Sequence, residues 1–183
     1  MDYLEIANNF ARNLWVVKKE IKLVDLMLFG SLANNKKNPR DVDLLFLHQN
    51  PILDKFQFEI VNQNISNIEK LYILNNLLNR EVNLEKIISN IGVKELIQKN
   101  LFQTKYMNLD FFKEKEYRTK WIKNNEEYNH PSIKKDYNGE KFEETIFKEG
   151  KLWNPQTKKY DIPAKQKYQV PKDIKQLENQ PST

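Results

Sequence analysis

The amino-acid sequence predicts a mixed α/β (α+β) fold, in which helices flank a small mixed sheet. Apolar side chains recur every three or four positions over residues 3–20, as in a helix with one buried face. Two aliphatic runs, residues 23–29 and 41–47, have the length and composition of buried strands. A polar loop over residues 33–40 separates the two runs. These observations predict two successive strands early in the chain.

The region that follows continues the alternation of helices and strands. Helical spacing of apolar residues returns over residues 52–79 and again over residues 86–106. Between them, residues 80–85 alternate polar and apolar side chains, which is the pattern of a short third strand. The expected order is therefore helix, strand, strand, helix, strand, helix.

The composition divides the 183 residues into three parts. Most aliphatic residues precede residue 112, whereas Lys, Glu, Asn, Tyr and Pro dominate the remainder. We therefore expect a packed domain over residues 1–110. A basic, partly ordered extension should follow, with a charged helix and a short β-hairpin over residues 111–162. Residues 163–183, in which three prolines stand among Lys and Gln, have the composition of a disordered tail.

Several classes of protein are excluded by what the sequence lacks. The absence of cysteine rules out disulfides and thiolate metal sites. No apolar run approaches the roughly 18 residues of a transmembrane helix, and the first residues do not have the pattern of a signal peptide. We therefore expect a cytoplasmic protein with no membrane partner. A net charge of +5 is compatible with RNA or a triphosphate as a partner.

The segment from Gly30 to Asp43 carries the clearest chemistry. Gly30 ends an apolar run and lets the backbone turn sharply beside a ligand. Ser31 offers a hydroxyl and an N–H group to a phosphate oxygen. Asp41 and Asp43 lie two residues apart on a predicted strand, so both carboxylates share one face, where they could bind Mg²⁺. Lys36 and Lys37, in the loop between Ser31 and Asp41, could neutralise a triphosphate.

These residues resemble the signature of the minimal nucleotidyltransferases of the DNA polymerase beta superfamily. That signature is an apolar strand, Gly-Ser, a polar loop, and Asp-x-Asp leading into a second apolar strand. Here it is matched by Leu28-Phe29-Gly30-Ser31 and by Asp41-Val42-Asp43-Leu44-Leu45, and the likeness extends over residues 4–106. The resemblance implies a nucleotidyltransferase-type mixed sheet.

The resemblance also implies an activity: Mg²⁺-dependent transfer of a nucleoside monophosphate, usually AMP from ATP as substrate, to a hydroxyl group. By position, Gly30 and Ser31 would hold the triphosphate, with Lys37 beside it. Asp41 and Asp43 would hold Mg²⁺ and act in catalysis.

Three positions depart from the family pattern. The third carboxylate of the family falls at Asn83, whose amide cannot act as a general base. Glu81 and Glu85 would share the face of Asn83 on a regular strand, and we expect Glu85 to substitute as a catalytic carboxylate. Leu32 and Arg40 also replace residue types that the family favours, which bears on phosphate binding.

Two functions therefore stay open. The first is an adenylyltransferase that modifies a hydroxyl of a protein or RNA, with an antitoxin-like role beside a protein partner as the resemblance suggests. The second is a catalytically degenerate nucleotidyltransferase-fold protein that binds a protein or nucleic-acid partner. A carboxylate on the third strand close to the two aspartates would favour the enzyme.

The remaining signals are weaker. His48 and His130 stand without cysteine partners, and we expect them on the surface. The aromatic residues of the extension either cover a small core or partner surface, or stack on bases. Asn138-Gly139 is a hairpin-turn signal, and residues 141–148 are long enough for one strand. Together with Gly150 to Trp153 and Ile162-Pro163-Ala164, that stretch faintly resembles β-hairpin repeats of the asparagine-glycine-lysine-leucine kind, which would dock on the N-terminal domain or on another protein.

Overall fold

The computed structural model describes residues 2–35, 37–78, 82–89, 92–125 and 139–171, and confirms the mixed α/β fold. The helices and strands up to the second strand are α1 (Tyr3–Val16), β1 (Leu23–Phe29), α2 (Gly30–Ala33) and β2 (Val42–His48). The central elements are α3 (Pro51–Glu59), α4 (Asn67–Leu78), α5 (Leu84–Ser89), α6 (Val93–Gln98), β3 (Phe102–Asn108) and the 3₁₀ helix η2 (Leu109–Phe112). The last elements are α7 (Lys115–Asn124), α9 (Gly139–Glu149), β4 (Lys151–Asn154), β5 (Lys159–Pro163) and the 3₁₀ helix η4 (Ala164–Gln166).

One sheet organises the described part of the chain, with its five strands in the order β3-β2-β1-β4-β5. Strands β1 and β2 are antiparallel and pair Phe29 with Asp43, whereas β2 and β3 are parallel and pair Asp43 with Gln103. The β4–β5 hairpin adds to the other edge of β1. The extension therefore completes the sheet that the first half of the chain begins.

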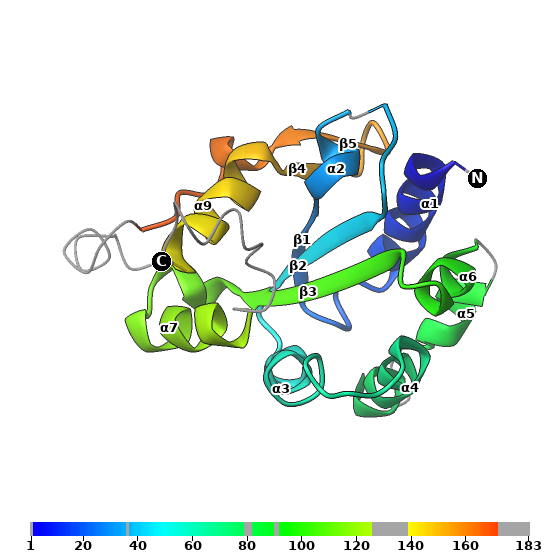
Figure 1. Ribbon diagram of the computed structural model, residues 1–183, viewed down its shortest axis with the longest axis horizontal. Coiled ribbons are helices and arrows are strands. Elements are labelled where there is room, and N and C mark those ends of the chain that lie inside the picture. Colours follow the sequence, from blue (N-terminus) through cyan, green and yellow to red (C-terminus); the bar gives the residue numbers. More distant parts are fainter. Residues whose placement is uncertain (1, 36, 79–81, 90–91, 126–138, 172–183) are drawn as a thin grey trace.

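Each face of the sheet has its own apolar core. Figure 1 shows α1, α4, α5 and α6 toward one side of the strands, and α7 and α9 toward the other. Side chains of β2 alternate between the two cores: Leu44 packs with the α1 side, and Leu45 and Leu47 pack with the α7 and α9 side. This alternation is the two-residue period of a strand that is buried on both faces.

The predicted third strand is wrong. Residues 79–81 lie outside the described residues, and residues 84–89 form helix α5. Asn83 caps this helix, because its side-chain oxygen accepts a hydrogen bond from the N–H of Lys86 at 3.1 Å. The third strand is β3 instead, within the end of a segment that the sequence analysis assigned to helix.

Two expectations for the extension are also wrong. Residues 141–148 belong to helix α9 rather than to a strand, because the adjacent side chains of Ile146 and Phe147 are both buried on one core. That helix removes the first half of the likeness to hairpin repeats. The second half, from Gly150 to Trp153 and at Ile162-Pro163, does form a hairpin, β4–β5, and it pairs with β1. The beginning of the expected tail is ordered: η4 packs on the same core, and Tyr168 donates a hydrogen bond to Asp25.

The aromatic residues of the extension serve the core where the structure describes them. Trp121 and Trp153 are almost fully buried, one on each face of the sheet. The indole N–H of Trp121 donates to the carbonyl oxygen of Tyr106 at 2.7 Å, which ties α7 to β3. Of the two expectations for these aromatic residues, the core is confirmed for both tryptophans. No helix in the described ranges is long and apolar enough to cross a membrane.

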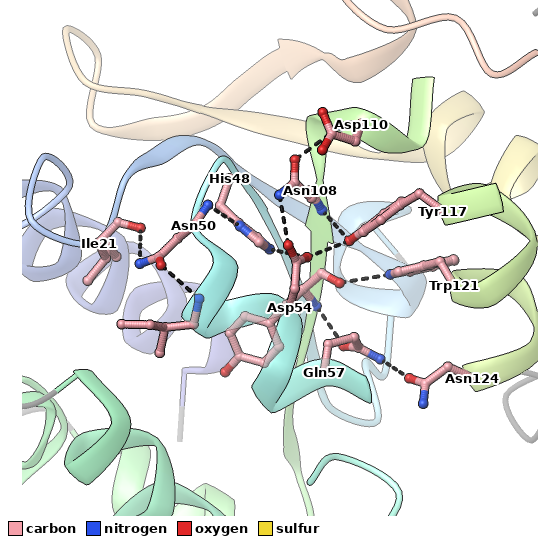
Figure 2. A network of polar contacts seen from close by, with 12 residues as sticks. Ile21, His48, Asn50, Asp54, Gln57, Asn108, Asp110, Tyr117, Trp121 and Asn124 are labelled. Atoms are coloured by element: carbon pink, nitrogen blue, oxygen red, sulfur yellow. Dashed lines mark hydrogen bonds and ion pairs between the residues drawn. The ribbon is translucent and has the colours of Figure 1, made fainter. Parts of the chain in front are cut away.

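A buried polar network fixes the ends of β2 and β3, and it includes His48 (Figure 2). The expectation that His48 lies on the surface is wrong, since its side chain is fully buried; His130 lies outside the described residues. His48 Nδ1 accepts the N–H of Asn50 at 2.9 Å, and its Nε2 lies 3.7 Å from Asp54 Oδ1. Burial lowers the pKa of His48 to about 3, so the imidazole is neutral.

Tyr117 is the central donor of this network. Its hydroxyl donates to Asp54 Oδ1 at 2.7 Å and accepts the N–H of Asn108 at 2.8 Å (Figure 2). Removing it in Tyr117→Phe leaves two partly buried groups without this partner, so we expect the free energy of unfolding to fall by roughly 1–3 kcal/mol. Urea unfolding measures the loss. The control Tyr72→Phe changes an exposed tyrosine and should stay within about 0.5 kcal/mol of wild type; equal effects of both substitutions would contradict the prediction.

Candidate functional site

The site gathers at the point where β1 ends and β2 begins. Asp43 lies near the start of β2, on the face that Leu45 and Leu47 continue toward α7 and α9. Asp41 immediately precedes the strand, and its carboxyl forms a side-chain hydrogen bond with Asp43. The structure thus brings together the two carboxylates that the sequence analysis paired.

The carboxyl group of Asp43 keeps its proton up to near neutral pH. Burial and the negative charge of Asp41 raise the pKa of Asp43 to about 7, and the hydrogen bond to Asp41 favours the same protonated form. The positive charge of Lys105 acts in the opposite direction but does not outweigh them. A divalent cation that displaced this proton would relieve the repulsion between the two carboxylates.

Gly30 provides a close approach of backbone to the carboxyl of Asp43. Its φ of +76° is in the region that favours glycine, and a Cβ at this position would lie 2.5 Å from Asp43 Oδ2. Any side chain here would therefore collide with the carboxyl group. The sequence analysis expected a sharp turn beside a ligand at Gly30, and the geometry provides the turn directly beside Asp43.

Ser31 and Lys37 lie on the loop side of the site. Ser31 Oγ accepts the backbone N–H of Arg40 at 3.2 Å, which holds the end of the loop that leads into β2. The hydroxyl hydrogen remains available to a phosphate oxygen. Lys37 is exposed in that loop, where a lysine can reach a ligand without being held against one. Lys36 lies outside the described residues.

Lys105 is the functional residue that sequence reasoning missed. It belongs to β3 and, like Gln103, shares the sheet face of Asp43, because Asp43 pairs with Gln103 and the side-chain period is two. Its side chain is only 3 % exposed, and Nζ donates to Asn125 Oδ1 at 2.9 Å. Asn125 caps α7 and donates in turn to the carbonyl oxygen of Trp121. The ammonium group is thus held by α7, and from β3 its positive charge acts on Asp43 of the adjacent strand.

Glu85 does not belong to the site. Its helix, α5, packs through Leu84 and Ile88 into the core on the opposite face of the sheet, and Glu85 itself is exposed. Glu81 lies outside the described residues. The expected third carboxylate is therefore wrong for Glu85, because the segment that carries it is a helix rather than a strand beside β2.

The described residues fit one divalent cation better than two. They contain no group of three or more His, Cys, Asp or Glu side chains that could hold a metal ion. Asp41 and Asp43 supply the hard oxygen ligands that Mg²⁺ prefers, and Mg²⁺ commonly takes only one or two carboxylates together with substrate phosphates and water. The positive charge of Lys105 acts on Asp43 from β3, where a second metal would require another carboxylate.

Comparisons of the chain with protein-family models, with curated proteins and with solved structures found no match. What the site offers is set by its own residues: two neighbouring carboxyl groups, a glycine turn against one of them, and a buried lysine on the next strand whose charge acts on Asp43.

Proposed function

We propose that this chain binds a nucleoside triphosphate with one Mg²⁺ ion at the Asp41–Asp43 pair, as a nucleotidyltransferase-like domain that no longer transfers the nucleotide. Asp41 and Asp43 would hold Mg²⁺, which when bound neutralises the carboxylates and the phosphates together. The backbone at Gly30, the hydroxyl of Ser31 and the exposed Lys37 would contact the phosphates.

The contact between Gly30 and Asp43 supports the proposal most strongly. A turn with a φ that favours glycine places main chain so close to the carboxyl of Asp43 that a Cβ would lie 2.5 Å from its Oδ2. If the two carboxyl groups only marked the start of a strand, no close contact with the backbone at Gly30 would be needed. Their mutual repulsion would then lower the stability of the fold with no compensating interaction. A bound cation gives both features a role, because it compensates the two charges beside a backbone that can approach phosphate.

Lys105 and its neighbour on β3 disfavour transfer of the nucleotide. Activation of an attacking hydroxyl needs a general base or a second metal ion close to the first. Among the described residues, the face of β3 beside Asp43 presents Gln103 and Lys105 rather than a carboxylate. An amide and an ammonium group cannot accept that proton, so binding without chemistry is the function that this residue set favours.

A protein that only binds a nucleotide needs a partner that distinguishes its nucleotide-bound form from its free form. The net charge of +5 suits RNA or an acidic protein surface. The resemblance to nucleotidyltransferases that neutralise a toxin makes a protein partner the candidate to search for first. In this proposal the nucleotide acts as a ligand that orders the domain for that partner.

The test follows the fate of ATP labelled at its α-phosphate, incubated with the protein, Mg²⁺ and an extract of protein and RNA acceptors. We expect the protein to retain the label as intact ATP in equilibrium dialysis and to release no labelled product. Label attached to a protein or RNA, abolished in Asp43→Asn, would instead make this chain a nucleotidyltransferase. Failure to retain ATP at millimolar concentration would exclude both functions.

A further inference from the structure

A cavity opens along the outer edge of β3. Its volume is about 120 Å³, far more than the roughly 10–15 Å³ that one water molecule requires. Phe56, Phe102 and Leu74 form apolar walls, and Thr104 and Asn67 add polar groups at the rim. Figure 1 shows β3 outermost in the sheet, with α3, α4 and α6 on the side where this cavity lies.

The backbone of Thr104 is directed into this cavity. The carbonyl oxygen of Leu101 accepts from Val42 of β2, so odd-numbered residues of β3 bond inward and even-numbered residues outward. Tyr106 follows this rule, since its N–H donates to Gln57 and its carbonyl accepts from Trp121. The N–H and C=O of Thr104 point the same way, and neither bonds to any residue that the structure describes.

Only a short stretch of the β3 edge has backbone N–H and C=O groups without a partner among the described residues. The length of this stretch limits which ligands can bind there. An added peptide strand would need several consecutive outward-facing groups. The groups of Tyr106 are taken by Gln57 and Trp121, and the N–H of Asn108 is taken by Tyr117. Among the described residues, what remains is the outward N–H and C=O of Phe102 and of Thr104, and only those of Thr104 lie beyond the first residue of the strand. A nucleobase complements the pair on Thr104, because its edge carries a neighbouring donor and acceptor and its faces are apolar.

The cavity and the candidate site lie on opposite faces of the sheet. Phe56, Phe102 and Tyr106, which line the cavity, belong to the core on the α1 side, whereas Asp43 lies on the face of Leu45. The two are linked through β3, whose Gln103 lines the cavity and is the register partner of Asp43. Because β3 is the outer strand, a nucleotide with its phosphates at Asp41 and Asp43 would need to pass around its free edge to place its base at Thr104.

We infer that the cavity at Thr104 is the nucleobase pocket of this protein. The inference rests on the proposed function for the phosphate half of the ligand, and assigns the base half to a different group of residues. The backbone of Thr104 hydrogen-bonds the edge of the base, and Phe56 and Phe102 pack beside the ring. Recognition by one donor and one acceptor accepts more than one base, so adenosine serves as the probe.

Three variants separate the backbone contact from the fold. Thr104→Pro removes the outward N–H, and proline is tolerated on an edge strand where that group is not in the ladder. Thr104→Val keeps the N–H and is the matched control, since it removes only the hydroxyl that bonds Tyr106. Leu71→Trp fills the cavity from α4 and leaves the strand unchanged. We expect adenosine to bind about tenfold more weakly to Thr104→Pro and to Leu71→Trp, and within about threefold of wild type to Thr104→Val.

Calorimetric titrations with adenosine, with Mg²⁺-tripolyphosphate and with Mg²⁺-ATP test the two halves of the ligand separately. We expect both fragments to bind to the wild-type protein, and Thr104→Pro to lose adenosine while keeping tripolyphosphate. If tripolyphosphate binds but adenosine does not, or if adenosine binding survives in both Thr104→Pro and Leu71→Trp, the base pocket is overturned and the phosphate site stands. If adenosine binds and depends on Thr104 but tripolyphosphate does not bind, the pocket stands and the proposed function fails.

Discussion

Replacement of Lys105 by aspartate is expected to raise the affinity for Mg²⁺ at least tenfold, which corresponds to about 1.4 kcal/mol. The substitution removes a buried positive charge from beside Asp43 and adds a third carboxylate on the same face of the sheet. Three carboxylates in a partly buried site repel one another strongly until a cation binds. Calorimetric titration with MgCl₂ measures the affinity, and the melting temperature should rise on adding Mg²⁺ more than it does for wild type.

The control for this prediction is Lys105→Met. It removes the same charge and the same hydrogen bond to Asn125 without adding a ligand, so its gain in Mg²⁺ affinity should be smaller. A folded Lys105→Asp variant whose Mg²⁺ affinity equals or falls below that of wild type would place Lys105 outside the site. Transfer of labelled nucleotide by Lys105→Asp, but not by wild type, would identify this lysine as the residue that prevents turnover.

Asp43→Asn is expected to stabilise the protein at pH 8, by up to about 4 kcal/mol. The pKa of Asp43 is raised from 3.8 to about 7, a net shift that already includes the attraction to Lys105, and each unit corresponds to about 1.4 kcal/mol. Because the folded pKa lies above the unfolded one, the folded state binds an extra proton between pH 4 and pH 7. The stability that Asp43 contributes is therefore present at low pH and lost as the pH rises through 7.

The difference in unfolding free energy between the variant and wild type isolates this effect. It should be largest at pH 8 and shrink toward zero near pH 4, where Asp43 is protonated in both states. His48, whose pKa is lowered to about 3, destabilises both proteins as the pH falls below 6.5, and so cancels in the difference. Urea unfolding across this range measures it. A difference in unfolding free energy that does not change with pH would contradict the raised pKa of Asp43.

Much of the fold could be predicted because aliphatic runs mark buried strands. Residues 23–29 and 41–47 became β1 and β2 with nearly the predicted ends. The alternation of polar and apolar residues over residues 80–85 led to a wrong prediction of a strand. Val82 and Leu84 are both buried, but Val82 precedes helix α5 and Leu84 begins it. A short alternation cannot separate a strand from the capped start of a helix. The side-chain amide of Asn83 was the signal for the cap.

Part of the candidate site could be predicted from the sequence, and part could not. Asp41 and Asp43 are close in sequence, so the two-residue period of the strand alone places them together. Lys105 comes from a distant segment, and only the parallel pairing of β2 with β3 brings it beside Asp43. Residues 102–108 carry aromatic and β-branched residues at every second position, Phe102, Thr104 and Tyr106, and these residue types favour a strand. The preceding helical spacing concealed that signal.

The most direct test of the proposed function is a calorimetric titration of the wild-type protein with ATP at pH 8, with and without Mg²⁺, beside the same titration of Asp43→Asn. We predict binding only when Mg²⁺ and Asp43 are both present, with weaker binding at pH 6, where the proton on Asp43 competes with the cation. Equal binding without Mg²⁺ or in Asp43→Asn, or no binding at millimolar ATP, would contradict a nucleotide site at this acidic pair.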